Sequence, residues 1–495
     1  MKNVLLSTAA VVCISGAAFG QSSGTEVIEA IDNGIAMMNS GESIFRFESR
    51  EVGSDNSVTF NNVEFGPEDD EVGFTAEWVK ATPSSTNDGA AIFTISDTII
   101  MNIDEGDVPV VITINSDDFL LETNLINGLG QTPMLSLSAD SITATGGAAD
   151  HPNLQNFDFN ATDLSVSFNF DMIARNIDAA LDSGVIALDV AATEDDEQIE
   201  VVLKSDGMTM DFTAQNVPMN EDMIKGFVDN DGSFKLTAST GGQYTRINLD
   251  SSELPIKMTT EAGPGQGEVS MIDGRFLYKG EAGSIKYVIE PDTSVMPFPP
   301  FTISMDSAVV DVQIPLRPSE DDQEVVFDLA LNELVIDDVL WMMADPAGNL
   351  PHEPANLLID LGATVRIDQP LVESLDNDGV ADLPIPFMVG QAKNIDINKV
   401  LLSVAGATID IAGAFDVNND GPIPMPLGKV DVSIKGVQAI ANHLVSMGLI
   451  EQAQVGMAMG MMMAFMKQGS EPDSFSTVID VTEDGVTANG TPLPF

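Results

Sequence analysis

The chain has 495 residues, of which 77 are acidic and only 20 are basic, so its formal net charge is −57. A surface this negative repels phosphate backbones and anionic lipid headgroups, which argues against nucleic-acid binding and against docking to an anionic membrane. Hydrophobic residues make up 44% of the chain. At this length they suffice for a sizeable core, so intrinsic disorder is not expected.

Residues 1–20 have the order of a secretory signal peptide. Lys2 precedes the apolar run Val4–Ile14, and small residues follow it up to Gly20, as in other export signals. The run is shorter than the roughly 20 residues of a bilayer-spanning helix. We therefore expect cleavage before Gln21, a periplasmic location and no transmembrane segment in the mature chain. Association with the outer membrane is compatible with this location.

The only cysteine of the chain, Cys13, lies inside this predicted signal. A mature chain without cysteine has neither a disulfide framework nor thiolate chemistry in an oxidising compartment. Burial of apolar groups must therefore hold the protein together.

The first predicted element of the mature chain is a helix at Thr25–Ser40, where apolar residues recur at helical spacing. Further helices are predicted at Asn220–Phe227 and Asp337–Met343. A C-terminal pair is expected within residues 437–467, at Val437–Met447 and Glu451–Lys467. Gly448 separates the two helices of this pair as a stop signal.

Between the predicted helices, polar and apolar residues alternate, as in Leu164–Phe170 and Val430–Ile434, and Asp-Gly turns separate such runs. Alternation with short turns favours antiparallel strands, whereas parallel sheets need crossover helices. The predicted fold class is mainly β (α+β): a long curved antiparallel β-sheet or groove with a few helices, including the C-terminal pair.

A proline-rich segment at residues 296–301 suggests a division into two parts. These would be an N-terminal β-rich half, residues 21–295, and a C-terminal β-rich half, residues 296–495. No low-complexity linker separates the halves, so one continuous sheet is an alternative.

The three histidines, His151, His352 and His443, are far apart in sequence, and none has a second histidine or cysteine at ligand spacing. His443 lies beside an apolar helical stripe and is predicted as a helix-flank residue. Carboxylates are too abundant for any pair to indicate acid–base chemistry. We therefore predict a protein that is not an enzyme, with no catalytic, cofactor-binding or metal-binding residues.

Two aspartate-rich loops resemble the start of a calcium-binding loop: Asp416–Gly421 and Asp376–Asp382. Neither has the glutamate that such loops carry at position twelve, since Leu427 and Ile385 stand there. The alternative is a polar hairpin turn, because Asn and Asp tolerate left-handed backbone. Both interpretations stay open.

The methionine-rich segment Val455–Met466 is apolar almost all round when drawn as a helix. It must therefore be buried on several sides or lie against an apolar partner. Flexible thioether side chains suit a lipid-facing wall. The alternative is a core helix that closes the end of a sheet.

Several segments resemble an alphaproteobacterial family of exported proteins, the domain of unknown function 2125. They are Val339–Pro346, Leu350–Ala355 and Leu358–Leu361, and, near the C-terminus, Leu401–Asp416, Gly428–Gly436 and Asp484–Leu493. The chain departs from the family pattern at His352, where an arginine is expected. The resemblance implies no established activity. The order of a sheet, a helix pair and a hairpin is also similar to AsmA-type envelope proteins, which implies an apolar groove linked to lipid handling.

Two functions are therefore expected. The first is a periplasmic binding protein that holds a lipid or another apolar ligand in a β-groove. The second is a structural or interaction protein of the cell envelope, with calcium as a candidate stabilising ligand.

Overall fold

The computed structural model describes residues 24–39, 45–66, 72–85, 90–103, 110–124, 134–147, 153–171, 173–194, 197–218, 227, 231–251, 255–292, 295, 298–346, 348, 350–368, 390–421 and 424–493. The predicted signal peptide, His151 and the loop Asp376–Asp382 lie outside these residues. The same holds for nearly all of the predicted helix Asn220–Phe227.

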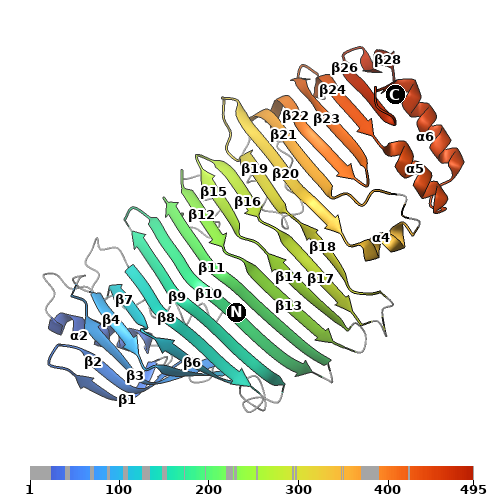
Figure 1. Cartoon of the computed structure of the whole chain (residues 1–495). Coiled ribbons are helices and arrows are strands. Elements are labelled where there is room, and N and C mark those ends of the chain that lie inside the picture. Colours follow the sequence, from blue (N-terminus) through green and yellow to red (C-terminus); the bar gives the residue numbers. More distant parts are fainter. Residues whose placement is uncertain are drawn as a thin grey trace. The chain divides into compact units, whose positions relative to one another are not determined.

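The chain forms two compact units. The first runs up to Val217 and takes in Leu236–Thr259, and the second comprises Pro218–Lys235 and the chain from Thr260 onward. Strands dominate both units and helices are few (Figure 1), so the predicted mainly-β fold is confirmed. The change between units falls upstream of the division at residues 295/296 that the proline-rich segment suggested.

The first unit begins with helix α2 (Gly24–Met38), which confirms the predicted N-terminal helix. The strands that follow are β1 (Phe45–Val52), β2 (Val58–Phe65), β3 (Val72–Pro83), β4 (Ala90–Ile95), β5 (Thr98–Ile103), β6 (Val110–Asp117), β7 (Leu120–Asn124), β8 (Met134–Gly147), β9 (Leu154–Asp171), β10 (Asn176–Glu194), β11 (Glu197–Gln215) and β13 (Gln243–Asp250). Strands β12 (Ser233–Thr240) and β14 (Ile256–Ala262) have residues in both units.

The strands of the first unit pair with antiparallel neighbours. Strand β2 pairs with β1 and β3, and β3 then pairs with both β4 and β5. One branch continues through β7 to β8 and the other through β6 to β8. From β8 the order is β9, β10, β11 and β13. Hairpin connections between such neighbours account for the short turns in the sequence.

Helix α2 packs on one face of this sheet and forms the core of the first unit. Val27, Ala30 and Ile31 recur at helical spacing, and all three are buried against strands β1 to β4. On the outer side of the helix, the Asp32 carboxylate lies 2.9 Å from the Arg50 guanidinium of β1. The helix is thus amphipathic, with its polar side outward.

The described part of the second unit contains strands β15 to β28 and three helices with defined bounds. The strands are β15 (Gly265–Ile272), β16 (Arg275–Ala282), β17 (Ile285–Pro291), β18 (Phe301–Met305), β19 (Ser307–Pro315), β20 (Gln323–Ile336), β21 (Ala355–Ile367), β22 (Gly390–Val404), β23 (Ala407–Asn418), β24 (Met425–Lys435), β25 (Lys467–Gln468), β26 (Ser474–Thr482), β27 (Gly485–Ala488) and β28 (Thr491–Pro492). The antiparallel order is β15, β16, β19, β20, β21, β22, β23, β24, β26, β27 and β28.

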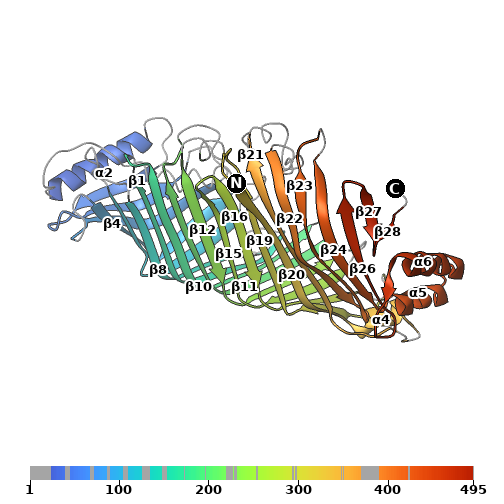
Figure 2. The same ribbon diagram turned by 90° about the horizontal axis from the view of Figure 1, so that it is seen from above.

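The helices of the second unit lie close to where the sequence predicts them. Helix α4 (Asp338–Ala344) is capped by the Asp337 carboxylate, which accepts a hydrogen bond of 2.9 Å from the Val339 backbone N–H. Helices α5 (Val437–Ser446) and α6 (Gln452–Phe465) form the predicted C-terminal pair and lie side by side (Figure 2). Within the described residues, no helix combines the length and the apolar character needed to cross a membrane.

Candidate functional site

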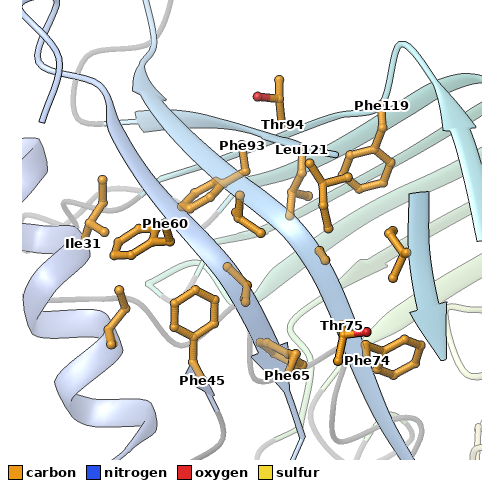
Figure 3. A pocket seen from close by; sticks show the side chains of 16 residues that line it. Ile31, Phe45, Phe60, Phe65, Phe74, Thr75, Phe93, Thr94, Phe119 and Leu121 are labelled. Carbon is orange, nitrogen blue, oxygen red and sulfur yellow. The ribbon is translucent and has the colours of Figure 1, made fainter. Parts of the chain in front are cut away.

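An apolar pocket of about 260 Å³ lies in the first unit, between helix α2 and the sheet (Figure 3). Helix α2 contributes two side chains, and strands β1 to β5 and β7 contribute most of the others. The lining residues are Ile31, Ile35, Phe45, Phe60, Val63, Phe65, Phe74, Thr75, Ala76, Val79, Phe93, Thr94, Ile95, Ile99, Phe119 and Leu121.

The left-handed backbone of Asn62 brings two neighbouring parts of β2 to the same pocket. Strict alternation would place Phe60 and Val63 on opposite faces of the strand. Instead, both side chains are buried and both line the pocket, because Asn62 has a φ of 51° and shifts the alternation by one residue. Asparagine adopts this conformation at little cost. Sequence reasoning missed these residues since it relied on an unbroken period of two.

Aromatic rings form one wall of the pocket. The Phe45 ring lies edge-on to that of Phe60, with 5.4 Å between their centroids, and also contacts Phe65 at 6.1 Å. These edge-to-face contacts fix the rings against one another. Large, rigid apolar side chains of this kind are typical of pockets that bind small hydrophobic ligands.

The chemistry of the lining excludes several kinds of site. Among the sixteen lining side chains, only Thr75 and Thr94 carry a polar atom, and none carries a charge. Among these lining side chains there is no acid or base to transfer a proton or to activate the two threonine hydroxyls, and no carboxylate, imidazole or thiolate to bind a metal ion. It can exclude water and surround a hydrocarbon group.

The pocket continues into an apolar row that crosses the sheet of the first unit. Phe93 and Leu121 belong to both the pocket and the row. The directly paired residues along the row are Phe93, Leu121, Leu137, Val166, Leu181 and Met210, one from each of β4, β7, β8, β9, β10 and β11. All six are partly exposed. At the usual strand spacing the row is about 24 Å long.

A second row on the same face widens this apolar surface. This second row is displaced from the first by two residues along each strand: Leu135 pairs with Phe168, Phe168 with Ala179, and Ala179 with Phe212. The opposite face is polar at the corresponding positions: Ser136 lies between Glu122 and Ser167, and Asp182 pairs with Thr209. The sheet is therefore two-faced, as the alternation predicts.

The apolar surface extends past an irregularity in the long strands. On one side of it the apolar residues of β10 have odd numbers, such as Leu181, and on the other side even numbers, such as Leu188. The change occurs at Gly184, next to the left-handed residues Asp163 of β9 and Gly207 of β11. We infer that these residues shift the alternation together and keep the apolar side chains on one face.

The sheet of the second unit has the same two-faced design. One apolar row consists of Val310, Leu329, Ile359, Val400, Ile411 and Val432. The neighbouring row on the other face is charged and consists of Lys279, Asp311, Asp328, Asp360 and Lys399. Burial, together with the adjacent Asp360 carboxylate, raises the pKa of Asp328 above its ordinary value.

The prediction of His443 as a helix-flank residue is wrong. Its side chain is buried, and its Nε2 lies 3.0 Å from the Oδ1 atom of Asp345, which is also buried. The Asp345 Oδ2 atom accepts a 2.6 Å hydrogen bond from the Leu350 backbone N–H. Because Asp345 follows helix α4 directly and His443 lies in α5, this pair ties the two helices together. His352 instead stacks on Trp341, with 4.7 Å between the ring centroids.

In the described aspartate-rich loop, Asp416–Asn418 form the end of β23, and Asn419–Gly421 begin the connection to β24. The Asn418 Oδ1 atom accepts a hydrogen bond of 2.9 Å from the Asp420 backbone N–H, and Asn419 donates to the Ala392 carbonyl at 2.7 Å. These bonds favour the turn interpretation. In the part of the chain that the structure describes, no three His, Cys, Asp or Glu side chains are grouped so that they could hold a metal ion.

The methionine-rich segment forms helix α6, and most of it is not a core helix. Val455 is its only buried residue among those described. Met457, Met461 and Met463 are more than half exposed. The interpretation of this segment as a plug buried at the end of the sheet therefore does not hold for these three side chains.

Comparison of the chain with protein-family models, with curated proteins and with solved structures gives no match. The resemblance to the domain of unknown function 2125 stays a prediction.

Proposed function

We propose that this protein binds the hydrocarbon chain of a lipid or a similar amphiphile, and that it holds this chain without catalysing a reaction on it. The observation that carries the proposal is the pocket beneath helix α2, whose sixteen lining residues include no charged side chain. The apolar row from Phe93 to Met210 supports it, because it offers a continuous surface for a chain longer than the pocket.

The proposed setting is the periplasm, reached through the predicted signal peptide at residues 1–20. An exported, acidic protein with a two-faced sheet suits the handling of apolar molecules between membranes. The resemblance to exported envelope proteins is consistent with this setting. The alternative proposal is a structural or interaction protein of the envelope, for which the pocket would be a packing defect without an occupant.

The test is ligand binding with a pocket-filling variant. Ala76 lines the pocket and pairs with Val63 across β2 and β3, so Ala76→Trp should fill much of the space. The wild-type protein should bind a fluorescent fatty acid and should carry lipid in native mass spectra. Ala76→Trp should weaken fatty-acid binding at least about tenfold.

The matched control is Ala180→Trp. Ala180 pairs with Ser167 and Asp211 on the polar face of the same sheet, so this variant should bind the fatty acid as the wild type does. Equal binding by Ala76→Trp and the wild type would contradict the proposal, as would the absence of any fatty-acid binding by the wild type.

A further inference from the structure

Helix α6 exposes a broad apolar arc. In a helical projection, Ala453, Gly456, Met457, Gly460, Met461, Met463 and Ala464 share an arc of about 160°, and each of them is exposed. Val455, Met459, Met462 and Met466 lie on the opposite side and are buried or partly buried. Met463 thus points outward, together with Met457 and Met461.

Packing of the second unit does not account for the exposed side. The inward residues already provide the contact with the rest of the unit. Exposed fractions of 68% for Met457, 58% for Met461 and 64% for Met463 are high for side chains of this kind, and Leu449, before α6, is 67% exposed. Groups of exposed apolar side chains of this kind mark interaction sites. We call Leu449, Met457, Met461 and Met463 the methionine surface.

The methionine surface is also free of charge in a highly charged protein. At the chain average of 20% charged residues, a helix of 14 residues would carry two or three charges. Helix α6 carries none, and from Val437 to Met466 the only acidic residue is Glu451. His443, in the same stretch, is buried against Asp345. This surface can therefore approach a partner without the electrostatic repulsion that the acidic remainder of the chain produces.

These features favour a lipid surface over other partners. A second copy of the chain would bring together two molecules of charge −57, and a charged peptide would find no complementary charge on α6. Methionine side chains are flexible and adapt to fluid hydrocarbon. A helix of 14 residues is too short to span a bilayer, but it can lie in the plane of the headgroups with one face inserted.

We propose that the methionine surface inserts into the interface of a lipid membrane with zwitterionic headgroups. Anionic headgroups are disfavoured, because the acidic remainder of the chain is repelled by them. The inference goes beyond ligand binding in the pocket and does not depend on it.

The test is flotation of the protein with lipid vesicles at physiological salt. The full chain is used and, in parallel, the chain from Gln21 onward, so that the apolar N-terminus cannot account for binding. Both should float with phosphatidylcholine vesicles, and replacing a third of the lipid by phosphatidylglycerol should reduce the bound fraction. The triple variant M457Q/M461Q/M463Q should lose at least about tenfold in vesicle partitioning, with unchanged thermal unfolding.

The matched control removes three exposed apolar side chains elsewhere, Val52, Ile173 and Val295, as V52Q/I173Q/V295Q, and should float as the wild type does. Three results would each overturn the proposal. The wild type could fail to float with phosphatidylcholine, or the methionine variant could float as well as the wild type. The methionine surface could also mediate a lipid-independent dimer that the triple variant abolishes in sedimentation measurements.

Discussion

Helices α2 and α6 both bury apolar side chains, but only α2 has the polar outer side of an amphipathic helix. Helix α2 buries Val27 and Ile31 and presents Glu29, Asp32 and Asn33 outward. Helix α6 buries Val455 and presents methionines outward. The same element therefore serves two purposes. The outer side of α2 is polar, and the pocket lies beneath this helix, whereas the outer side of α6 is an exposed apolar surface.

The sharpest test of this comparison is truncation of a buried side chain under α2. Phe60 is 1% exposed and contacts the rings of Phe45 and Phe47. Phe60→Ala should destabilise the first unit by about 3–5 kcal/mol, since it leaves a cavity in a packed core. Hydrogen exchange measured by mass spectrometry should show the loss of protection in strands β1 to β4 and not in β19 to β24. Uniform loss in both units would show that they unfold together.

The next largest loss of stability is expected when the contact between His443 of α5 and Asp345 at the end of α4 is removed. His443→Ala should cost about 3 kcal/mol, because it leaves the buried Asp345 carboxylate without its imidazole partner. Urea unfolding monitored by tryptophan fluorescence can measure this in a Trp78→Phe background, in which the signal comes from Trp341 of α4. A double-mutant cycle with Asp345→Asn should give a coupling energy well above zero. Additive effects would mean that the two side chains do not stabilise the fold as a pair.

A substitution on the charged face of the second unit should have a smaller effect on the free energy of unfolding, and this effect should be stabilising. The pKa of Asp328 is raised in the folded state, so the folded protein accommodates the neutral carboxyl group more favourably than the ionised one. The stability that protonation adds is complete below the unfolded pKa and is lost as pH rises through the folded pKa. Asp328→Asn should therefore stabilise the protein at pH 7 by about 0.2–1 kcal/mol.

Chemical unfolding of wild type and Asp328→Asn at a series of pH values can check this sign. The advantage of the variant should shrink as pH falls through about 4 and vanish near pH 3, where the wild-type carboxyl group is neutral in both states. Asn332, which is partly buried in the same strand and donates to the Ser307 hydroxyl, provides a control position, since Asn332→Gln should have no such pH dependence. An advantage that grows toward low pH would contradict the assignment.

The smallest stability effect should occur on the methionine surface. Met461→Ala should change the free energy of unfolding by no more than about 0.5 kcal/mol, because an exposed side chain loses little packing when it is shortened. Thermal unfolding can measure this. Val455→Ala provides the contrast within the same helix, with an expected loss of about 1–2 kcal/mol for a buried side chain. Equal losses for both would imply that Met461 is packed rather than exposed.

Local sequence patterns determined the strands and helices of this protein. Alternation in β9 and β24 and helical spacing in α2, α4 and α5 predict these elements because backbone geometry fixes which side chains share a face. The Asp-Pro after α4 and the Gly448 between α5 and α6 mark helix ends for the same local reason. These signals need no knowledge of distant residues.

Only the tertiary structure decided which faces and side chains meet. The pocket depends on the left-handed Asn62, which brings Phe60 and Val63 together, and the apolar row depends on a strand register that distant segments fix jointly. The contact between Asp345 and His443 joins residues almost a hundred positions apart. In helix α6 nearly every residue is apolar, so the sequence has no pattern from which the outward side could be chosen. Packing against the second unit makes that choice.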